Sequence, residues 1–340
     1  MQDNVYSQGS LSLPHIAVST GDPNGIGPEI VLKTLAAWPK PWDFIPVVAG
    51  SQSLFEFYRS TIDAEPGINF RTCTSPSDAQ SGFLNFVSIH DEETDLPSPG
   101  QIQAEAGKAS MESVAMCIEW CLEDKTQAIV TPPISKEAIQ AGGYRVPGHT
   151  EFLAERTESE SHLMMLVNDN LRVALATIHI PLAAVATSLT QNVIVDKLTV
   201  LHTSLKHDFR ISNPRIAVLG LNPHAGDGGV IGREEIEIIQ PALARAEERG
   251  IRTDGPFPAD GFFGNRMQNN YDAIFAMYHD QGLVPFKTLS FGEGVNFTAG
   301  LPIVRTSPDH GTAFAIAGKN RADHKSFAKA LRLAVDLSRL

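Results

Sequence analysis

Short runs of aliphatic and β-branched residues alternate along this chain with stretches of helical periodicity. Such alternation is typical of βαβ units, in which helices connect neighbouring parallel strands. We therefore predict an α/β fold of two α/β/α domains with mostly parallel sheets. The clearest strand candidates are residues 16–19, 44–49, 128–131, 163–167, 172–178, 215–220 and 272–277.

Two stretches between these strands have the features of helices. Residues 104–125 have helical periodicity, and residues 233–250 begin with acidic side chains and stop at a glycine, which suits the helix dipole. The sequence contains no internal repeat, low-complexity tract or obvious linker. A domain boundary must therefore be inferred from the order of the elements.

The charge balance limits what the chain can bind. The 340 residues carry a formal net charge of -12, and no basic stripe suited to nucleic acid occurs. An anionic substrate would need a local cationic pocket. No apolar run reaches the ~18 residues of a membrane span, and residues 1–12 lack a secretory pattern. We therefore expect a cytoplasmic protein that binds neither nucleic acid nor membranes.

The three cysteines do not form a metal-type pattern. Cys117 and Cys121 are four residues apart in a helical stretch, and Cys73 is isolated. We interpret all three as reduced core residues.

Three predicted strands each run into a histidine. His179, His224 and His279 follow the strands that begin near residues 172, 215 and 272. Ligands of open α/β sheets bind beyond the carboxyl ends of the strands, so these side chains could meet and chelate a divalent cation. The alternative is that each histidine caps a strand or bonds a loop carbonyl. The three histidines do not have the close sequence spacing of a local metal motif, so spacing does not decide between a metal site and these structural roles.

Three further segments have polar residues near predicted strands or beside small residues. Residues 21–30, GDPNGIGPEI, form a glycine-rich turn that does not fit the dinucleotide fingerprint, so a tight packing turn is at least as good an interpretation. Residues 131–136 and 147–151 follow another strand, where Ser135 could simply cap a helix. Residues 287–320 combine cations and amides with small residues, which suits an anion and a nucleotide, although a solvated loop has the same composition.

Taken together, these segments resemble the 4-hydroxythreonine-4-phosphate dehydrogenases of pyridoxal phosphate biosynthesis, the PdxA family, within the isocitrate and isopropylmalate dehydrogenase-like superfamily. The resemblance spans nearly the whole chain. It rests on GDPNGIGPEI, PGHTEFLA at 147–154, ATIHIPL at 176–182, LNPHAGDGG at 221–229, YHDQGLVPFK at 278–287 and RTSPDHGTAFAIAGKN at 305–320.

The resemblance implies a site for each ligand. It implies a divalent metal on His179, His224 and His279, and NAD near His310, Gly311, Thr312 and Asn320. The substrate contacts that it implies are His149, Thr150, Lys287, Asn296 and Arg305.

The resemblance also implies a homodimer whose active site lies between two domains and is shared by both subunits. We expect a discontinuous nucleotide-side domain of residues 1–133 and 290–340, and a metal- and dimer-side domain of residues 134–289. One position departs from the superfamily pattern: Ala315 stands where an aspartate usually follows in the nucleotide loop. This departure leaves the choice between NAD and NADP open, although NAD is favoured as in the family.

The expected reaction is oxidation of 4-phosphohydroxy-L-threonine by NAD, followed by decarboxylation to 3-amino-2-oxopropyl phosphate. Imidazole ligands favour zinc, with cobalt or magnesium as alternatives. Lys287 and His149 are candidates for proton transfer, while Asp260 and Asp280 are candidates to bind the metal or orient a histidine.

Several rival functions share these features. A related decarboxylating dehydrogenase could act on a phosphorylated sugar acid or a carboxylated dihydrodiol. A metal-dependent hydrolase would use the histidines without a nicotinamide, and a binding protein would hold ligands without turnover.

Overall fold

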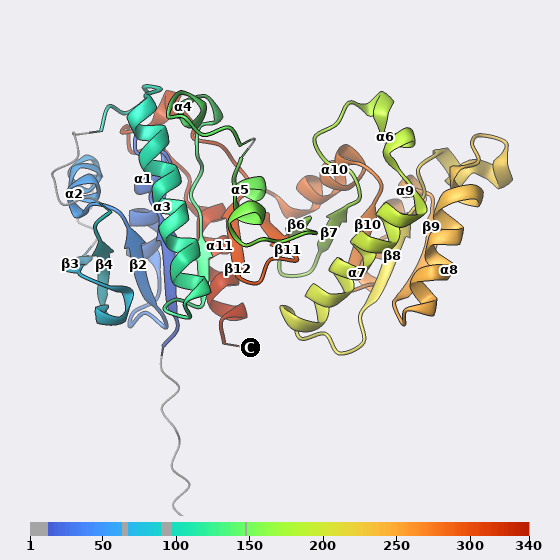
Figure 1. Cartoon of the computed structure of the whole chain (residues 1–340), viewed down its shortest axis with the longest axis horizontal. Helices are drawn as coiled ribbons and strands as arrows, with labels where there is room; N and C mark the ends of the chain where they lie inside the picture. Colours follow the sequence, from blue (N-terminus) through green and yellow to red (C-terminus); the bar gives the residue numbers. More distant parts are fainter. Residues whose placement is uncertain (1–12, 63–66, 90–96, 147, 340) are drawn as a thin grey trace, which may run out of the picture.

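A computed structural model of the chain describes residues 13–62, 67–89, 97–146 and 148–339. The polar N-terminal stretch 1–12 and His90, to which we assign no role, lie outside these ranges. Within them the strands form a single sheet of 12 strands in the order β3-β4-β2-β1-β5-β12-β11-β6-β7-β10-β8-β9. Helices cover both faces of this sheet, as Figure 1 shows.

The strands are short and mostly buried. They are β1 (His15–Ser19), β2 (Ile45–Ala49), β3 (Asn69–Cys73), β4 (Phe83–Val87), β5 (Ala128–Val130), β6 (Leu163–Val167), β7 (Arg172–Leu175), β8 (Arg215–Leu219), β9 (Arg252–Phe257), β10 (Ala273–Ala276), β11 (Val295–Ala299) and β12 (Val304–Pro308).

The helices alternate with these strands over most of the chain. They are α1 (Gly27–Ala37), α2 (Gln52–Thr61), α3 (Ala104–Leu122), α4 (Lys136–Ala141), α5 (His149–Arg156), α6 (Leu182–Ser188), α7 (Gln191–His207), α8 (Gln240–Glu248), α9 (Ala259–Gly264), α10 (His279–Ser290) and α11 (Lys325–Leu337). Short 3-10 turns lie at Pro76–Asp78, Pro223–Gly229, Met267–Asn270 and Phe314–Ile316. None of the helices described is long and apolar enough to cross a membrane.

Strand direction divides the sheet into two parallel blocks. The strands β3, β4, β2, β1, β5 and β12 run parallel to one another, as do β7, β10, β8 and β9. Between the blocks, β11 and β6 pair antiparallel with each other and with their outer neighbours. The α/β fold with mostly parallel pairing is therefore confirmed, with one continuous sheet running through both halves.

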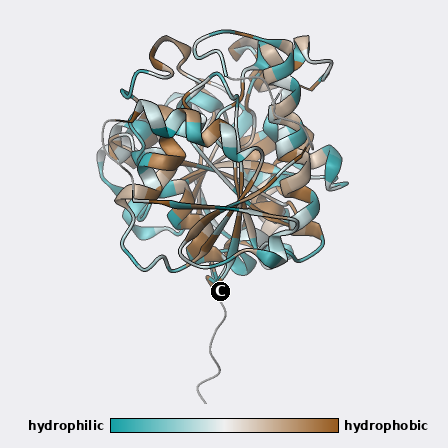
Figure 2. Cartoon of the chain, turned by 90° about the vertical axis from the view of Figure 1, so that its left-hand side faces the viewer, coloured by the Kyte–Doolittle hydropathy of each residue, from teal (hydrophilic) through white to brown (hydrophobic). Residues whose placement is uncertain are grey.

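The two parallel blocks define two halves of the sheet: the first contains the strands from β3 to β12, and the second contains those from β7 to β9. The hydrophobic core consists of four clusters, one on each face of each half. In the first half, α1 and α11 pack on one face, and α3, α4 and α5 pack on the other. In the second half, α7 and α8 cover the first of these faces, and α9 and α10 cover the second. Figure 2 shows the apolar strands inside and the hydrophilic sides of the helices outside.

Several local expectations are confirmed and two need correction. Pro28 lies in the first turn of α1, and Ser135 Oγ accepts a hydrogen bond from Ala138 N at 3.2 Å at the start of α4. All three cysteines are free and buried. The expected helix 233–250 is instead a π-helical turn, Glu235–Ile239, followed by α8, and the expected strand 172–178 ends at Leu175.

Candidate functional site

Polar side chains occupy the middle of the sheet on the face covered by α3, α4, α5, α9 and α10. Arg305 lies opposite Ile129 and Asn296 lies opposite Leu166, and both of these partners belong to the clusters of that face. Thr298 is two residues from Asn296 on the same strand, so it points the same way. A polar patch at the centre of an otherwise apolar sheet is costly to fold, which identifies it as a candidate binding site.

Arg305 is the largest fully buried side chain of the structure. Its Nε and one terminal nitrogen donate to Thr131 Oγ1 at 3.0 and 2.8 Å, and the other donates to Thr298 Oγ1 at 3.2 Å. Burial lowers the pKa of Arg305 to about 9, and the charge of Glu151 opposes this shift. The guanidinium therefore remains charged at neutral pH, although its direct partners are neutral hydroxyls.

His149 lies close to Arg305 as the first residue of α5. Burial, followed by the nearby charge of Arg305, lowers the pKa of His149 well below its usual value, so the ring is neutral at pH 7. His149 Nε2 is buried without a hydrogen-bond partner, and so is Asn296 Oδ1. Buried polar atoms normally have partners, so these atoms are candidates to contact a bound ligand. We call Thr131, His149, Asn296, Thr298 and Arg305 the Arg305 cluster.

Glu151 and Lys136 also belong to this region, although sequence reasoning assigned them no role. A Cβ atom on Gly148 would lie 3.6 Å from Glu151 Oε2 and 3.9 Å from Lys136 Cε, so both side chains flank that glycine. Burial, together with the charge of Lys136, lowers the pKa of His179, and the charge of Glu151 opposes this shift as it does at Arg305. Glu151 therefore lies within electrostatic range of the Arg305 cluster and of the histidine at the end of β7.

Two of the three expected histidines lie side by side. The ring centroids of His179 and His279 are 5.9 Å apart with planes tilted by 44°. His279 Nδ1 shares a 2.8 Å hydrogen bond with Asp280 Oδ1. A carboxylate on one ring nitrogen fixes the orientation of an imidazole and leaves the other nitrogen free for a ligand. Asp280 is therefore suited to orient His279.

The strand ends that carry these histidines are held in register by side chains. Gln281 Nε2 donates to Gly220 O at 2.5 Å, while its Oε1 accepts from Met277 N at 2.7 Å, which joins the end of β10 to the end of β8. Thr177 Oγ1 donates to Met277 O at 2.8 Å, which joins β7 to β10. The carboxyl ends of all three strands therefore form one fixed edge.

His224 lies in a loop of unusual backbone shape. Residues His224 to Gly228 all have positive φ, and His224 itself has φ 54°. The buried Glu235 carboxylate accepts from the backbone of Leu221 and Asn222, both at 2.7 Å. Glu235 begins the π-helical turn, an element frequent at functional sites. The fold thus holds this exposed histidine in a strained but well-supported loop.

Within the part of the chain that the structure describes, no three His, Cys, Asp or Glu side chains form a group that could hold a metal ion. The structure brings together His179 and His279, and His224 makes no recorded contact with either. Neutral imidazoles are nonetheless the donors that zinc and related cations prefer. The chemistry of these donors fits a divalent metal.

The remaining expected residues of this edge are dispersed. Lys287, on α10, forms a 3.0 Å ion pair with Asp309 at the end of β12, which links the second half to the first. Thr150 is the partly buried second residue of α5, and Asp260 is exposed at the start of α9.

The expected cofactor residues form a loop after β12 that packs on the GDPNGIGPEI turn. Ile26 N donates to Thr312 O at 3.1 Å, and a Cβ on Gly25 would lie 3.1 Å from that oxygen. His310 Nε2 is buried without a partner, and no atom lies within 4 Å of a Cβ built on Gly311. The glycine-rich turn therefore supports the loop that follows β12.

The end of this loop includes the position that departs from the superfamily pattern. Ala315 is exposed, and its carbonyl accepts from Lys319 Nζ at 2.8 Å. Asn320 has a left-handed backbone with φ 55°.

The fold and the polar centre of its sheet are those of an α/β enzyme, in which ligands bind at strand ends. The family model described as pyridoxal phosphate biosynthetic protein PdxA matches residues 43–334. The chain belongs to this family, as its sequence motifs indicate.

Relatives and solved structures agree with this assignment. A 4-hydroxythreonine-4-phosphate dehydrogenase of Bacteroides thetaiotaomicron is 45% identical over 95% of this chain and 88% of its own length. The crystal structure of the enzyme of that name from Klebsiella pneumoniae has a TM-score of 0.87 at 37% identity, covering 96% of this chain and 99% of that one. A terephthalate 1,2-cis-dihydrodiol dehydrogenase from Burkholderia xenovorans is more distant, with a TM-score of 0.66 at 29% identity, covering 95% and 97%.

Proposed function

We propose that this chain oxidises 4-phosphohydroxy-L-threonine with NAD and that the product then loses carbon dioxide to give 3-amino-2-oxopropyl phosphate, in the pathway to pyridoxal 5'-phosphate. The observation that carries the proposal is the Arg305 guanidinium, buried and charged without a directly bonded carboxylate. A buried cation is stabilised by an anionic ligand, and the substrate carries a phosphate and a carboxylate.

The Arg305 cluster would recognise that substrate. Arg305 would neutralise one anionic group, and Lys287 would reach the other once its ion pair with Asp309 opens. Asn296 and His149 each have a buried atom without a partner, which suits them to polar groups of the substrate. Thr150 would donate its hydroxyl from the start of α5.

His149 is our first candidate to accept the proton of the substrate hydroxyl. The ring is neutral at pH 7 and its Nε2 has no partner, so its lone pair is available to the substrate hydroxyl, although burial and the charge of Arg305 lower its basicity. Lys287 is the second candidate. Asp280 would orient His279 rather than transfer a proton, and the exposed position of Asp260 makes it the weakest of the four catalytic candidates.

His179, His224 and His279 would hold a divalent cation, for which zinc is the first choice and cobalt or magnesium are alternatives. Such an ion would supply Lewis acidity at the substrate hydroxyl and, later, at the oxygen that gains charge as carbon dioxide leaves.

We propose that the three histidines meet only in a homodimer. Leu182 and Val230, which lie close in sequence to His179 and His224, are 72% and 82% exposed. Large apolar side chains beside exposed histidines favour a surface that a second copy covers. The shared active site expected from the family would then complete the metal site.

NAD would accept the hydride from the substrate carbon. The loop with His310, Gly311, Thr312 and Asn320 would bind the cofactor, with the open space beside Gly311 allowing close approach to the backbone. Ala315 removes the carboxylate that could hold the adenosine ribose, so the choice of NAD over NADP would rest on other contacts.

The two-domain division stays a proposal, with residues 1–133 and 290–340 on the nucleotide side and 134–289 on the metal side. Ile139, Phe152 and Leu153 pack in the cluster around α3, so α4 and α5, which this division assigns to the metal side, lie against the nucleotide side.

Two alternatives make different predictions. A dihydrodiol carboxylate would lack the phosphate, so a dehydrogenase for that substrate would turn over without it. A hydrolase would form no NADH at all.

The test is NADH absorbance when the full-length protein, with NAD and zinc, meets 4-phosphohydroxy-L-threonine, beside a control treated with EDTA. We expect NADH to form and chelation to abolish it. The His224→Ala variant should lose turnover and bind less metal. Undiminished rate and metal content in that variant would rule out the three-histidine site.

A further inference from the structure

Residues 309–324, which we call the β12–α11 loop, connect the end of β12 to the start of α11 and contain the proposed cofactor residues. The first residue of the loop is tied to the helix that follows it. Asp309 N donates to Ser326 Oγ at 3.0 Å, and Ser326 Oγ donates to Gly294 O at 3.0 Å. Both ends of the loop are therefore attached to α11.

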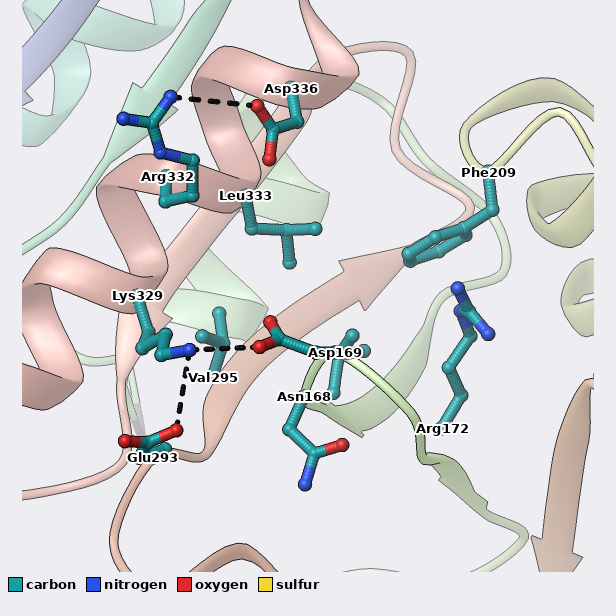
Figure 3. A pocket seen from close by; sticks show the side chains of 11 residues that line it. Asn168, Asp169, Arg172, Phe209, Glu293, Val295, Lys329, Arg332, Leu333 and Asp336 are labelled. Atoms are coloured by element: carbon teal, nitrogen blue, oxygen red, sulfur yellow. Dashed lines mark hydrogen bonds and ion pairs between the residues drawn. The ribbon is translucent and has the colours of Figure 1, made fainter. Parts of the chain in front are cut away.

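The helix α11 is in turn anchored to the middle of the sheet. Lys329 pairs with Asp169, in the turn between β6 and β7, at 2.9 Å and with Glu293 at 3.3 Å. These ion pairs line a cavity of about 260 Å³ between α11 and that turn, as Figure 3 shows. The ends of the β12–α11 loop thus lie on a fixed frame, and the shape of the rest depends on contacts of the loop itself.

An ion pair on α1 holds the later part of this loop. Glu29 Oε1 accepts a hydrogen bond from Ala322 N at 2.9 Å, and Lys33 Nζ donates to Ala322 O at 3.1 Å. Lys33 Nζ and Glu29 Oε1 are themselves 2.7 Å apart. One ion pair therefore satisfies both polar backbone groups of Ala322, which is buried.

This pair is costly to bury. The side chain of Glu29 is fully buried and that of Lys33 is 17% exposed, on the helix face that packs in an otherwise apolar core cluster. Glu29 Oε2 is buried without a hydrogen-bond partner. Desolvation of two charges commonly outweighs their attraction, so apolar residues would serve the core as well or better. The contacts with Ala322 favour a role in fixing the conformation of the loop.

The same helix also holds the earlier part of the loop, through the hydrogen bond from Ile26 N to Thr312 O at 3.1 Å. Asn320, another proposed cofactor residue, lies two positions before Ala322 and has a left-handed backbone with φ 55°. Residues other than glycine seldom adopt that conformation, and it persists where neighbouring contacts fix it. The contacts with Ala322 are the nearest such constraint after Asn320 in the sequence.

We propose that Glu29 and Lys33 are positioning residues for the cofactor: their ion pair holds residues 320–322 in the shape that binds NAD. The role rests on the proposed function, in which the loop after β12 binds NAD. The pair acts through the backbone of Ala322. Without it, the loop would adopt the binding shape for only a fraction of the time, and the Kd for NAD would rise by the inverse of that fraction.

Isothermal titration of the full-length, zinc-loaded protein with NAD, in the absence of substrate, measures this change. Lys33→Met should raise the Kd for NAD about tenfold, as expected if the binding shape falls to roughly a tenth of the population. At saturating NAD the loop regains its shape, so kcat and the KM for 4-phosphohydroxy-L-threonine should stay within about twofold of the wild type.

Two further variants separate positioning from a general effect of charge. Lys33→Arg keeps a charged donor and should restore the Kd for NAD to within about threefold of the wild type. Lys108→Met is the matched control, since Lys108 also pairs with a glutamate four residues on, Glu112, at 3.8 Å on the exposed side of α3. It should leave the Kd unchanged.

The double variant Glu29→Gln/Lys33→Met decides the matter if Lys33→Met does not fold, because it leaves no unpaired buried charge. In this variant, amide hydrogen exchange of a peptide covering residues 318–324 should be faster than in the wild type, and the Kd for NAD should again rise about tenfold. Faster exchange with an unchanged Kd would overturn the positioning role alone. Absence of NAD binding by the wild type would overturn the proposed cofactor and the positioning role together.

Discussion

The Arg305 cluster and the pair formed by His179 and His279 lie near each other but differ in completeness. Arg305 is 1% exposed and its hydrogen bonds come from the same chain. The two histidine rings are 5.9 Å apart beside exposed residues, without a third ligand among the residues described. In our proposal, a single folded chain pre-forms the anion site, whereas the cation site needs the assembly of two chains.

The largest effect is expected from removing an imidazole. His279→Ala should lower turnover by about 10³-fold or more and reduce zinc content, because one ligand is lost from a catalytic site. Zinc content by atomic absorption and NADH formation measure the two effects. His207→Ala, at an exposed histidine at the end of α7, is the control and should leave both unchanged. Full zinc occupancy in His279→Ala would contradict a role for His279 in metal binding.

Arg305→Met should act on the other region alone. We expect kcat/KM to fall by about 10²–10³-fold, since truncating one member of a buried charge pair costs about 2–5 kcal/mol. Zinc content should be unchanged. Arg156→Met, at an exposed arginine paired with Glu119, is the matched control. A loss of zinc from Arg305→Met as well would mean that the Arg305 cluster and the histidine pair do not act independently.

Val230→Asp tests whether assembly completes the cation site. The charge should weaken a dimer through this surface, so activity and zinc content should fall by about tenfold at low protein concentration and recover at high concentration. Sedimentation velocity gives the oligomeric state. Leu122→Asp, at the 47% exposed end of α3, is the control. A dimeric Val230→Asp protein without zinc would separate assembly from metal binding.

The smallest effect concerns a buried carboxyl outside both regions. Burial, opposed by a hydrogen bond from Asn24 N, raises the pKa of Asp22 from 3.8 to about 6. Its contribution to stability is complete below the unfolded pKa and is lost as pH rises to about 6. Asp22→Asn should therefore raise the free energy of unfolding by about 1–3 kcal/mol above pH 6, with little change below pH 4.

Urea unfolding at pH 4 and pH 8 measures this difference. Because Asp22 lies in the turn that supports the loop after β12, kcat/KM should stay within about threefold of the wild type if the carboxyl has only a structural role. A larger loss would assign Asp22 to ligand binding.

Apolar runs predicted β1, β2, β5, β6, β7, β8 and β10, whereas β3, β4, β9, β11 and β12 were missed. β11 and β12 contain Asn296, Arg305 and Thr306, which interrupt the aliphatic pattern. Those polar residues are stable in strands because Arg305 and Thr306 find partners in Thr131 and in the Ala330 carbonyl, neither of which is local in sequence. The continuity of one sheet through both halves depends on these missed strands.

The candidate site could be predicted only in part, because some of its residues lie at strand ends and others depend on how helices pack. Strand ends are visible in sequence, so His179 and His279 could be expected at one edge. Glu151 and Lys136 could not be assigned, since their positions depend on how α4 and α5 pack beside the sheet. A glutamate within the PGHTEFLA motif was the only available signal for Glu151.

The position of β12 between β5 and β11 also sets an order for biosynthesis. A ribosome that has reached residue 290 has already made β6 to β10, which are contiguous in the sheet and lack only their neighbour β11. At that point β5 still lacks β12, and the core of the first half lacks Phe327 and Leu331 of α11. The half that contains the earliest residues to emerge is thus the last to be completed, and its exposed strand edge must be protected during translation.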